Sequence, residues 1–468
     1  MINSNNLNRF IEYALPLTAA LIICRAFPVL SFFYYAVPFI LLCTFIFYLT
    51  LTLTPNFNLH PTFTGASEDR TTGRPNLYLN LFTRNKHLKT LLLLIALFGM
   101  WASITAFWSP FPKVSLSRAA YFFLITIPPV LLGYLWSKNE RNELFAFLLP
   151  ANFIIVMVSL YSLITSAPAN AWTGGHGLGF MGYAGHQNTL AAAIVFTVPS
   201  VLFPLLKEIT ERLKNKDKSI IIKTRLTFSI FLIPPVLWLR RAGFILIFIL
   251  NLYLLILSVS RAGVITLIIM LLVFILLSFN KKTTLLLIFL IISAFAISFV
   301  SSQTVREFVF KTEETIGDRR IVNIRETIEA AKNGGFFGLG YGISQPPSND
   351  RVIGHYENNG KLFVREKMIG MLALVEEVGV IGLAFFLAVI GYVFLLLLKT
   401  FKTVTLSLSK GIQSFNHAHK LLLSVIVAFC SHAQFEAWWV GVGSVQLPLF
   451  FMVIGLGFGR MALVGNRQ

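Results

Sequence analysis

Residues 242–279 read AGFILIFILNLYLLILSVSRAGVITLIIMLLVFILLSF, two long apolar runs separated by one short polar turn. Each run approaches the ~20 residues that an α-helix needs to cross the hydrocarbon core of a bilayer. The turn holds Ser258, Ser260 and Arg261 and has room only for a tight connection. This stretch predicts a helical hairpin in a membrane, because lipid offers unpaired backbone groups no partner.

Most of the chain repeats this pattern. It has 468 residues, of which 56% are hydrophobic and 13% charged, and its mean hydropathy is +0.74. That composition is typical of a membrane protein with many spans rather than of a soluble domain. Hydropathy predicts about twelve transmembrane helices, near residues 10–28, 31–53, 88–107, 119–136, 144–166, 189–206, 242–260, 262–279, 284–301, 378–398, 420–437 and 443–459. We therefore expect an all-α integral membrane protein that forms one polytopic domain over residues 1–468.

The distribution of Lys and Arg predicts the orientation of these helices. The connection 207–225 is rich in both residues, whereas the preceding connection 167–188 has neither. Because short basic loops stay in the cytoplasm, the first is expected inside and the second outside. The same rule puts both termini in the cytoplasm and the long polar segment 302–377 on the external face. We expect this large loop to contain short helices and to carry part of the active site.

The formal net charge of +19 raises the question of a nucleic-acid partner. Most of the excess lies in the predicted inside loops, where topology and anionic lipid headgroups account for it. We therefore expect no nucleic-acid partner. The three cysteines, Cys24, Cys43 and Cys430, lie in apolar segments without metal-ligand spacing, so we expect them to pack as small residues.

Polar residues gather at several places on the predicted outer face. The first is Gly182–Asn188, a Gly-rich turn that leads into the span beginning at Thr189. Its glycines let backbone approach a ligand closely, and Asn188 stands where a helix N-cap is expected. Capping explains Asn188 as well as a functional role does, but it does not explain His186.

The second place is the turn Ser258–Gly263 with Arg261. For an average arginine at a helix end, snorkelling to the interface is the commoner explanation. Here the small residues around it leave the guanidinium little else to bind. Its planar fork suits a phosphate or diphosphate held at the membrane surface.

The third place is the external segment. Between residues 304 and 332, apolar residues at helical spacing predict an amphipathic helix, and its other faces include Arg319 and Arg320. A solvated helix face explains most of these charges. The Gly-aromatic turn Gly334–Gly342 follows, and it is not a phosphate loop, because no Gly-Lys-Ser/Thr comes after it.

The chain then returns to the membrane past His355 and Arg365-Glu366-Lys367, and it enters the next span through Glu376–Gly382. Near the C-terminus, Glu436 with Trp438 and Trp439 is expected at the outer rim. Tryptophan there is ordinary behaviour of the aromatic belt, whereas a carboxylate at that depth is less ordinary.

Taken in order, these segments resemble the O-antigen ligase and O-antigen polymerase superfamily of polytopic membrane glycosyltransferases. The motifs that carry the resemblance are Trp108-Ser109-Pro110 with Ser115 and Arg118, Gly182–Asn188, Ser260–Gly263, Arg320–Gly342 and Glu377–Gly382. Two positions depart from the family pattern. Gly179 stands where ligases commonly have an arginine, and Glu366-Lys367 stands near the place of the family's His-Asn pair.

The resemblance implies a GT-C-like fold and transfer of a glycan from a polyprenyl-diphosphate donor to an acceptor hydroxyl, with inversion. Such a reaction needs cationic groups at the departing diphosphate and a base for the hydroxyl proton. For the diphosphate we expect Arg261, Arg319, Arg320 and Lys367. For the base, His355, Glu366 and His186 stay as alternatives. Supporting roles are expected for Ser260, Asn188, Glu377, Glu436, Trp438 and Arg118.

No metal or other cofactor is expected. The chain's aspartates are Asp69, Asp217, Asp318 and Asp350, and no two of them form Asp-x-Asp. An acidic cradle for a metal-bound diphosphate is therefore hard to assemble, so cationic side chains must neutralise the donor.

The acceptor stays open between lipid A core, another glycan and a protein hydroxyl, and with it the choice between a ligase and a repeat-unit polymerase. The expected partners are the lipid-linked donor, one of these acceptors and membrane lipids, in the cytoplasmic (inner) membrane. A secondary transporter of small solutes is the alternative from another class, because about twelve helices would suit it. Against it, the polar residues cluster at the outer rim and no internal repeat is visible. A membrane scaffold without activity is the third possibility.

Overall fold

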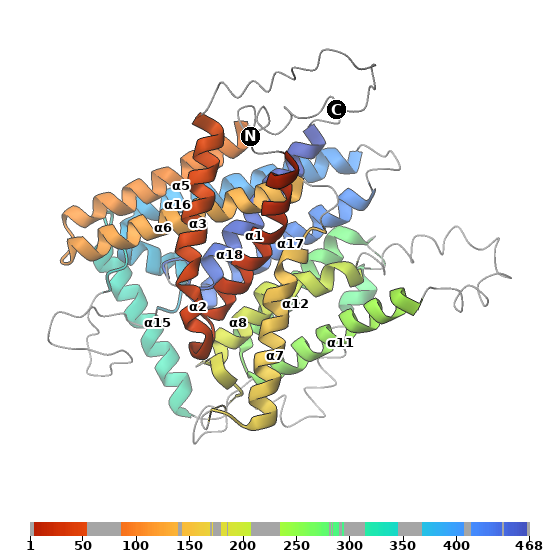
Figure 1. Cartoon of the computed structure of the whole chain (residues 1–468). Helices are drawn as coiled ribbons and strands as arrows, with labels where there is room; N and C mark the ends of the chain where they lie inside the picture. Colours follow the sequence, from red (N-terminus) through yellow and green to blue (C-terminus); the bar gives the residue numbers. More distant parts are fainter. Residues whose placement is uncertain are drawn as a thin grey trace, which may run out of the picture.

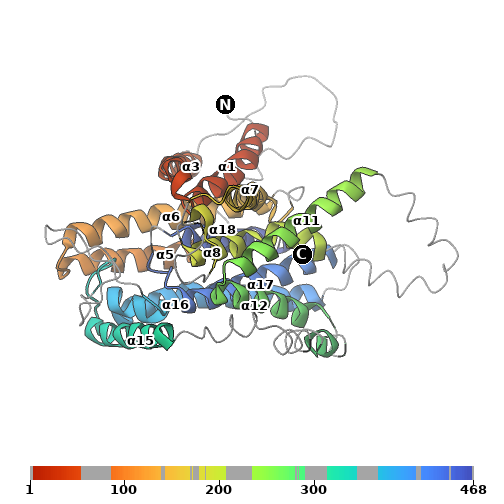
Figure 2. The same cartoon turned by 90° about the horizontal axis from the view of Figure 1, so that it is seen from below.

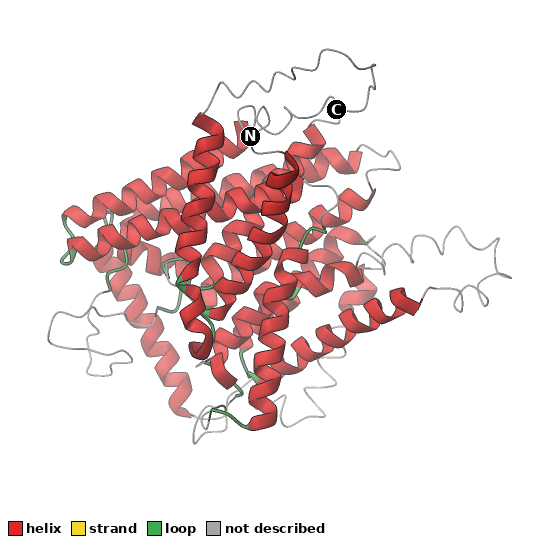
Figure 3. Ribbon diagram, in the orientation of Figure 1, coloured by secondary structure: helices red, strands yellow, loops and turns green. Residues whose placement is uncertain are grey.

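The computed structural model describes residues 4–53, 86–138, 143–168, 171, 179–184, 186–206, 235–279, 282, 284–289, 293, 314–344, 367–406, 413–441 and 444–465. Within these ranges the secondary structure is helical, without a β-strand (Figure 3). The helices are α1 (Ser4–Cys24), η1 (Pro28–Leu30), α2 (Ser31–Tyr34), α3 (Ala36–Leu53), α5 (Lys86–Ile104), η2 (Thr105–Phe107), α6 (Pro112–Lys138), η3 (Ala146–Leu148), α7 (Leu149–Thr165), η4 (Gly182–Ala184), α8 (Gln187–Thr197), α11 (Pro235–Leu257), α12 (Arg261–Ser278), α15 (Glu314–Gly334), α16 (Gly370–Leu406), α17 (Gln413–Phe435) and α18 (Gln446–Gly465).

Seven helical segments among the described residues are long and apolar enough to cross a membrane: Lys86–Phe107, Pro112–Ser137, Ala146–Thr165, Gln187–Leu206, Arg261–Ser278, Gly370–Thr400 and Ala418–Phe435. Four shorter apolar helices accompany them: Ile11–Cys24, Pro28–Cys43, Arg241–Leu257 and Gln446–Ala462. The expectation of an all-α membrane protein is confirmed for this part of the chain. The predicted span 284–301 and much of the predicted external loop 302–377 lie outside the described residues.

α18 lies at the centre of the bundle and packs along α6 (Figure 1). The two backbones touch at glycines. A Cβ added to Gly133 of α6 would lie 2.1 Å from the carbonyl oxygen of Met452, and one added to Gly455 of α18 would lie 2.1 Å from that of Val130. Gly455 and Gly459 are four residues apart, the spacing by which small residues let membrane helices approach closely.

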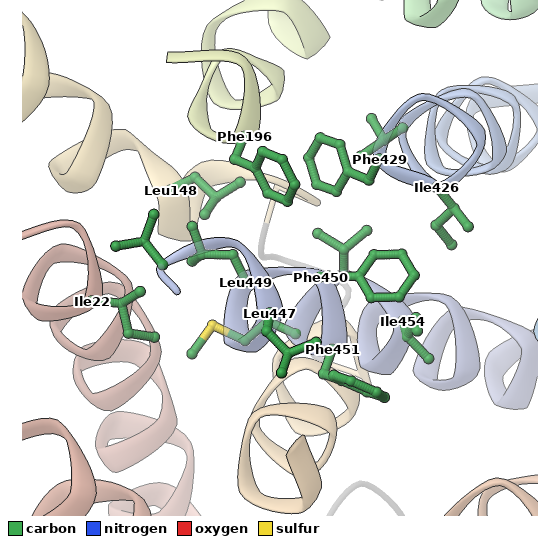
Figure 4. Packing of buried hydrophobic residues seen from close by; sticks show 14 of the residues in the cluster. Ile22, Leu148, Phe196, Ile426, Phe429, Leu447, Leu449, Phe450, Phe451 and Ile454 are labelled. Carbon is green, nitrogen blue, oxygen red and sulfur yellow. The ribbon is translucent and has the colours of Figure 1, made fainter. Parts of the chain in front are cut away.

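α17 packs against α12, and α8 lies beside both (Figures 1 and 2). Phe196 of α8 stacks on Phe429 of α17, with ring centroids 3.7 Å apart and planes inclined by 17°. Figure 4 shows these two rings facing each other beside Leu449 and Phe450 of α18. This buried contact fixes the position of α8 against α17.

α15 lies at one edge of the molecule, packed against α16 (Figures 1 and 2). It corresponds to the polar helix expected between residues 304 and 332, whose described part runs from Glu314. The Gly-rich turn at its C-terminal end brings the chain back onto α16.

Candidate functional site

The helix α16 is broken near its start, at Gly379. This residue has φ 73° and ψ 179° inside an otherwise helical segment. A Cβ added there would lie 2.1 Å from the carbonyl oxygen of Phe336, in the turn that follows α15. Only glycine fits this conformation and this close contact.

The turn 334–342 satisfies the backbone groups that the break leaves without partners. In a regular helix, the N–H of residue 380 would bond to the carbonyl of residue 376, and likewise 381 to 377. Four bonds to the turn replace those two: Val380 N to Gly335 O (3.0 Å), Ile381 N to Phe336 O (3.3 Å), Leu339 N to Glu376 O (2.9 Å) and Gly340 N to Glu377 O (3.0 Å). The Gly-aromatic turn therefore stabilises the break in α16.

The end of α5 and its connection to α6 contact both this turn and α16. The indole Nε1 of Trp101 donates to Val378 O at 2.7 Å, and that of Trp108 donates to Gly338 O at 2.9 Å. The backbone N–H of Tyr341 donates to Thr105 Oγ1 at 3.0 Å. Three motifs that lie far apart in the sequence, around Trp108, Gly338 and Glu377, thus meet at one place.

Glu377 is the centre of a buried polar cluster at this place. Its Oε2 accepts the backbone N–H of Gly342 at 2.6 Å, and its Oε1 pairs with Lys367 Nζ at 2.5 Å. Lys367 also lies 3.4 Å from Glu376 Oε2. Arg118 donates to the carbonyl of Gly342 at 2.7 Å. The side chain of Lys367 is 5% exposed, so its ammonium is paired with protein carboxylates in this arrangement.

Tyr341 lies beside this cluster. Burial raises the pKa of its phenol well above the usual value, the Glu377 carboxylate raises it further, and Arg118 opposes the rise. The phenol is therefore neutral at physiological pH. Its ring packs edge-on against Phe98 and Phe122, with centroids 6.1 Å away in both cases.

A second polar group lies where α8 begins. His186 is the N-cap of α8, and its Nδ1 accepts the backbone N–H of Asn188 at 3.1 Å. The prediction of Asn188 as N-cap is wrong, because the helix begins at Gln187. Instead, the amide Nδ2 of Asn188 donates to Glu436 Oε1 at 2.6 Å. Glu436 directly follows α17 and is half-buried.

α12 begins at Arg261, next to the first turns of α8. Its N-cap, Ser260, makes no capping bond, and the buried Ser260 hydroxyl, 2% exposed, has no hydrogen-bond partner. A Cβ added to Gly263 would lie 2.9 Å from that of Ala191 in α8. The first turns of α8 and α12 therefore lie side by side, and the half-buried Arg261 stands at the end of this pair.

Gly179 fills the space between the two helix starts. A Cβ added there would lie 2.4 Å from Gln187 Oε1 and 2.5 Å from Ser258 O, and the φ of this glycine is +158°. The next residue, Phe180, donates its N–H to Leu257 O at 2.7 Å. An arginine, which the family pattern places here, would not fit without moving one of these helices.

The indoles near Glu436 are core residues. Trp438 and Trp439 are 4% and 1% exposed, so they pack inside the protein and do not form part of a lipid-facing aromatic belt. Trp438 donates from Nε1 to His432 Nδ1 at 3.1 Å and packs edge-on against Phe196. The aromatic side chains around α8 and α17 bury both indoles. This packing holds the segment that carries Glu436 in position.

The two polar groups belong to one region, because the start of α16 lies against the end of α17. A Cβ added to Gly370 would lie 2.5 Å from the carbonyl oxygen of Ala433. Gly370 follows Lys367 by three residues, and Glu436 follows Ala433 by three.

Some predicted site residues lie beyond what the structure describes. His355 and Glu366 are outside the described residues, and of Arg319 and Arg320 only the backbone, in α15, is described. Within the described ranges, no group of three or more His, Cys, Asp or Glu side chains is arranged to hold a metal ion.

The helices and their apolar lengths define a multi-pass membrane protein. Residues 246–364 match the family model described as O-antigen ligase. The match supports the resemblance to the O-antigen ligase superfamily, and it spans the second half of α11, all of α12 and the described segment from α15 to Ser344. Arg261, Arg319, Arg320 and His355 fall within it, whereas α8 and Glu436 do not. A search of curated proteins found no match.

Proposed function

We propose that this protein is an inverting, metal-independent glycosyltransferase that moves a glycan from a polyprenyl-diphosphate donor to an acceptor hydroxyl. The observation that carries the proposal is the start of α12, where Ser260 and Arg261 lie inside the region matched by the O-antigen ligase family. The donor's diphosphate would bind there.

The local chemistry supports an anion at this place. The first N–H groups of a helix lack partners inside it and carry a partial positive charge, which favours a phosphate group. At α12 no side chain of the N-cap occupies them. The unpartnered hydroxyl of Ser260 and the guanidinium of Arg261 add further donors. Loss of one such contact costs about 3 kcal/mol of transition-state stabilisation, or about 100-fold in rate.

The reaction would take place at the outer face of the cytoplasmic membrane, with both termini inside and the segment 302–377 outside. The beginning of α1 and the end of α18 lie at the top of Figure 1, and the end of α7 lies at the bottom. This arrangement supports the orientation that the basic loops predict. Part of the active site would then come from the external segment.

A ligase and a repeat-unit polymerase of this superfamily differ in their acceptor. The proposal covers lipid A core, a glycan repeat or a protein hydroxyl as acceptor. All three would present a hydroxyl group at the outer face of the cytoplasmic membrane, so the chemistry at the diphosphate would be the same.

The test is Arg261→Ala in cells that lack the native gene, with the exposed Arg325→Ala of α15 as matched control. We expect Arg261→Ala to lower surface polysaccharide about 100-fold and to raise the lipid-linked donor, at equal protein level. Arg325→Ala should leave both unchanged. Unchanged polysaccharide in the Arg261→Ala strain would instead favour a transporter or a scaffold.

A further inference from the structure

We propose that Glu436 is the general base that takes the proton from the acceptor hydroxyl, an inference that rests on the proposed function. Glu436 lies immediately after α17, and Asn188 of α8 holds its Oε1 through a 2.6 Å hydrogen bond. The side chain is half-buried, so it is oriented by the protein and still reachable from outside. A general base needs both properties.

The carboxylate stands next to the place proposed for the leaving group. Asn188, which contacts Glu436, lies in the first turn of α8, and Ala191 one turn later touches Gly263 in the first turn of α12. The base, at the end of α17, and Arg261, at the start of α12, thus both lie beside the beginning of α8. A sugar placed between them would have the acceptor on one face and the diphosphate on the other.

His186 is the other described candidate for the base, and its hydrogen bond argues against it. Its Nδ1 accepts the backbone N–H of Asn188. A neutral imidazole that accepts at Nδ1 carries its proton on Nε2, so its remaining nitrogen is a donor. His186 in this state caps α8 and has no free lone pair for a hydroxyl proton. A carboxylate has acceptor capacity beyond its bond to Asn188.

The step balances without a co-reactant. The acceptor O–H bond breaks, and its proton moves to a carboxylate oxygen of Glu436. The acceptor oxygen forms a bond to the anomeric carbon of the donor sugar. The bond from that carbon to the diphosphate oxygen breaks, and its electron pair leaves with the polyprenyl diphosphate near Arg261. Glu436 then returns the proton to water or to the released diphosphate.

The experiment compares Glu436→Gln with the wild-type protein in membrane vesicles that contain the host's own lipid-linked donor and acceptor. Glutamine keeps an oxygen that accepts the hydrogen bond of Asn188 but takes no proton. We expect transfer per molecule of protein to fall more than 100-fold while the donor still co-purifies with the protein. The matched control is Glu329→Gln, the same substitution at an exposed residue of α15. This variant should transfer glycan at the wild-type rate.

Asn188→Ala separates the base from its support. This variant removes the hydrogen bond but leaves the carboxylate. We therefore expect transfer per molecule of protein to fall about 10-fold, less than in Glu436→Gln. The assignment is overturned if Glu436→Gln transfers within fivefold of the wild type, or if Asn188→Ala loses more than Glu436→Gln. Arg261→Ala in the same vesicles tests the proposed function separately: loss there with normal Glu436→Gln transfer would reject the base alone.

Discussion

Glu377 shows how one side chain can fasten two segments to a membrane helix. It accepts from Gly342 N–H and pairs with Lys367, and these residues flank positions 345–366. A buried carboxylate without such partners would be very costly. The ion pair therefore depends on both flanking segments being in place against α16.

Glu377→Ala tests this dependence at the scale of one residue. It leaves the buried Lys367 ammonium short of one carboxylate and Gly342 without its acceptor. We predict a loss of about 3–5 kcal/mol in unfolding free energy, measured as chemical unfolding in detergent. Glu329→Ala on the exposed face of α15 should change the free energy of unfolding little. Equal unfolding midpoints for wild type and Glu377→Ala would contradict the role given to this pair.

The sequence points to several residues of the candidate site but not to their partners. Asn188 is recognisable from the Gly-rich turn, yet its contact with Glu436 joins positions 248 residues apart, and local pattern carries no such information. Lys367 is a plausible diphosphate ligand as a lone cation, and only the structure shows its carboxylate partners. Partners across the fold are a product of packing, which a single sequence does not display.

At the scale of elements, α16 and the turn after α15 form one unit. The break at Gly379 exposes backbone groups that the turn 334–342 satisfies, and the turn needs glycines to come close enough. A Cβ added to Gly338 would lie 2.4 Å from Glu377 O. The segment from α15 to Ser344 is thereby anchored on α16 along its length.

Gly379→Ala tests this unit, and Gly391→Ala in the same helix is its control. An added methyl at 379 meets Phe336 O, whereas one at 391 has nothing within 4 Å. We predict that Gly379→Ala lowers the free energy of unfolding by on the order of 2–4 kcal/mol, because it disrupts the backbone hydrogen bonds of the turn. The loss would be measured as a lower melting temperature and as faster proteolysis between α15 and α16. Gly391→Ala should match the wild type. Similar behaviour of the two variants would show that the turn does not depend on the break.

The helices themselves are largely predictable, because runs of apolar residues of membrane length leave few other folds. The break in α16 is not predictable in the same way. Residues 378–398 read as one apolar span, and the only local sign is Gly379 itself. The signal for the break lies in the Gly-rich turn about 40 residues earlier, and it becomes visible only when the two are in contact.

At the scale of the whole molecule, the ends of helices that are distant in the sequence assemble the polar region. α8, α12 and α17 bring Asn188, Arg261 and Glu436 to neighbouring positions, and α16 adds the Glu377 pair through its contact with α17. Deep aromatic and glycine contacts hold these helices at fixed spacing. The bundle therefore acts as a rigid support for the polar region that we propose as the site.

The most direct measurement is the binding of a sugar-free polyprenyl diphosphate to the purified full-length protein, by native mass spectrometry in EDTA-treated buffer. Cationic and backbone donors at the start of α12 should bind it without a metal ion, and Arg261→Ala should weaken binding about 100-fold, whereas Arg325→Ala should not. Equal affinity for wild type and Arg261→Ala, or binding that appears only after magnesium is added, would contradict a diphosphate site at Arg261.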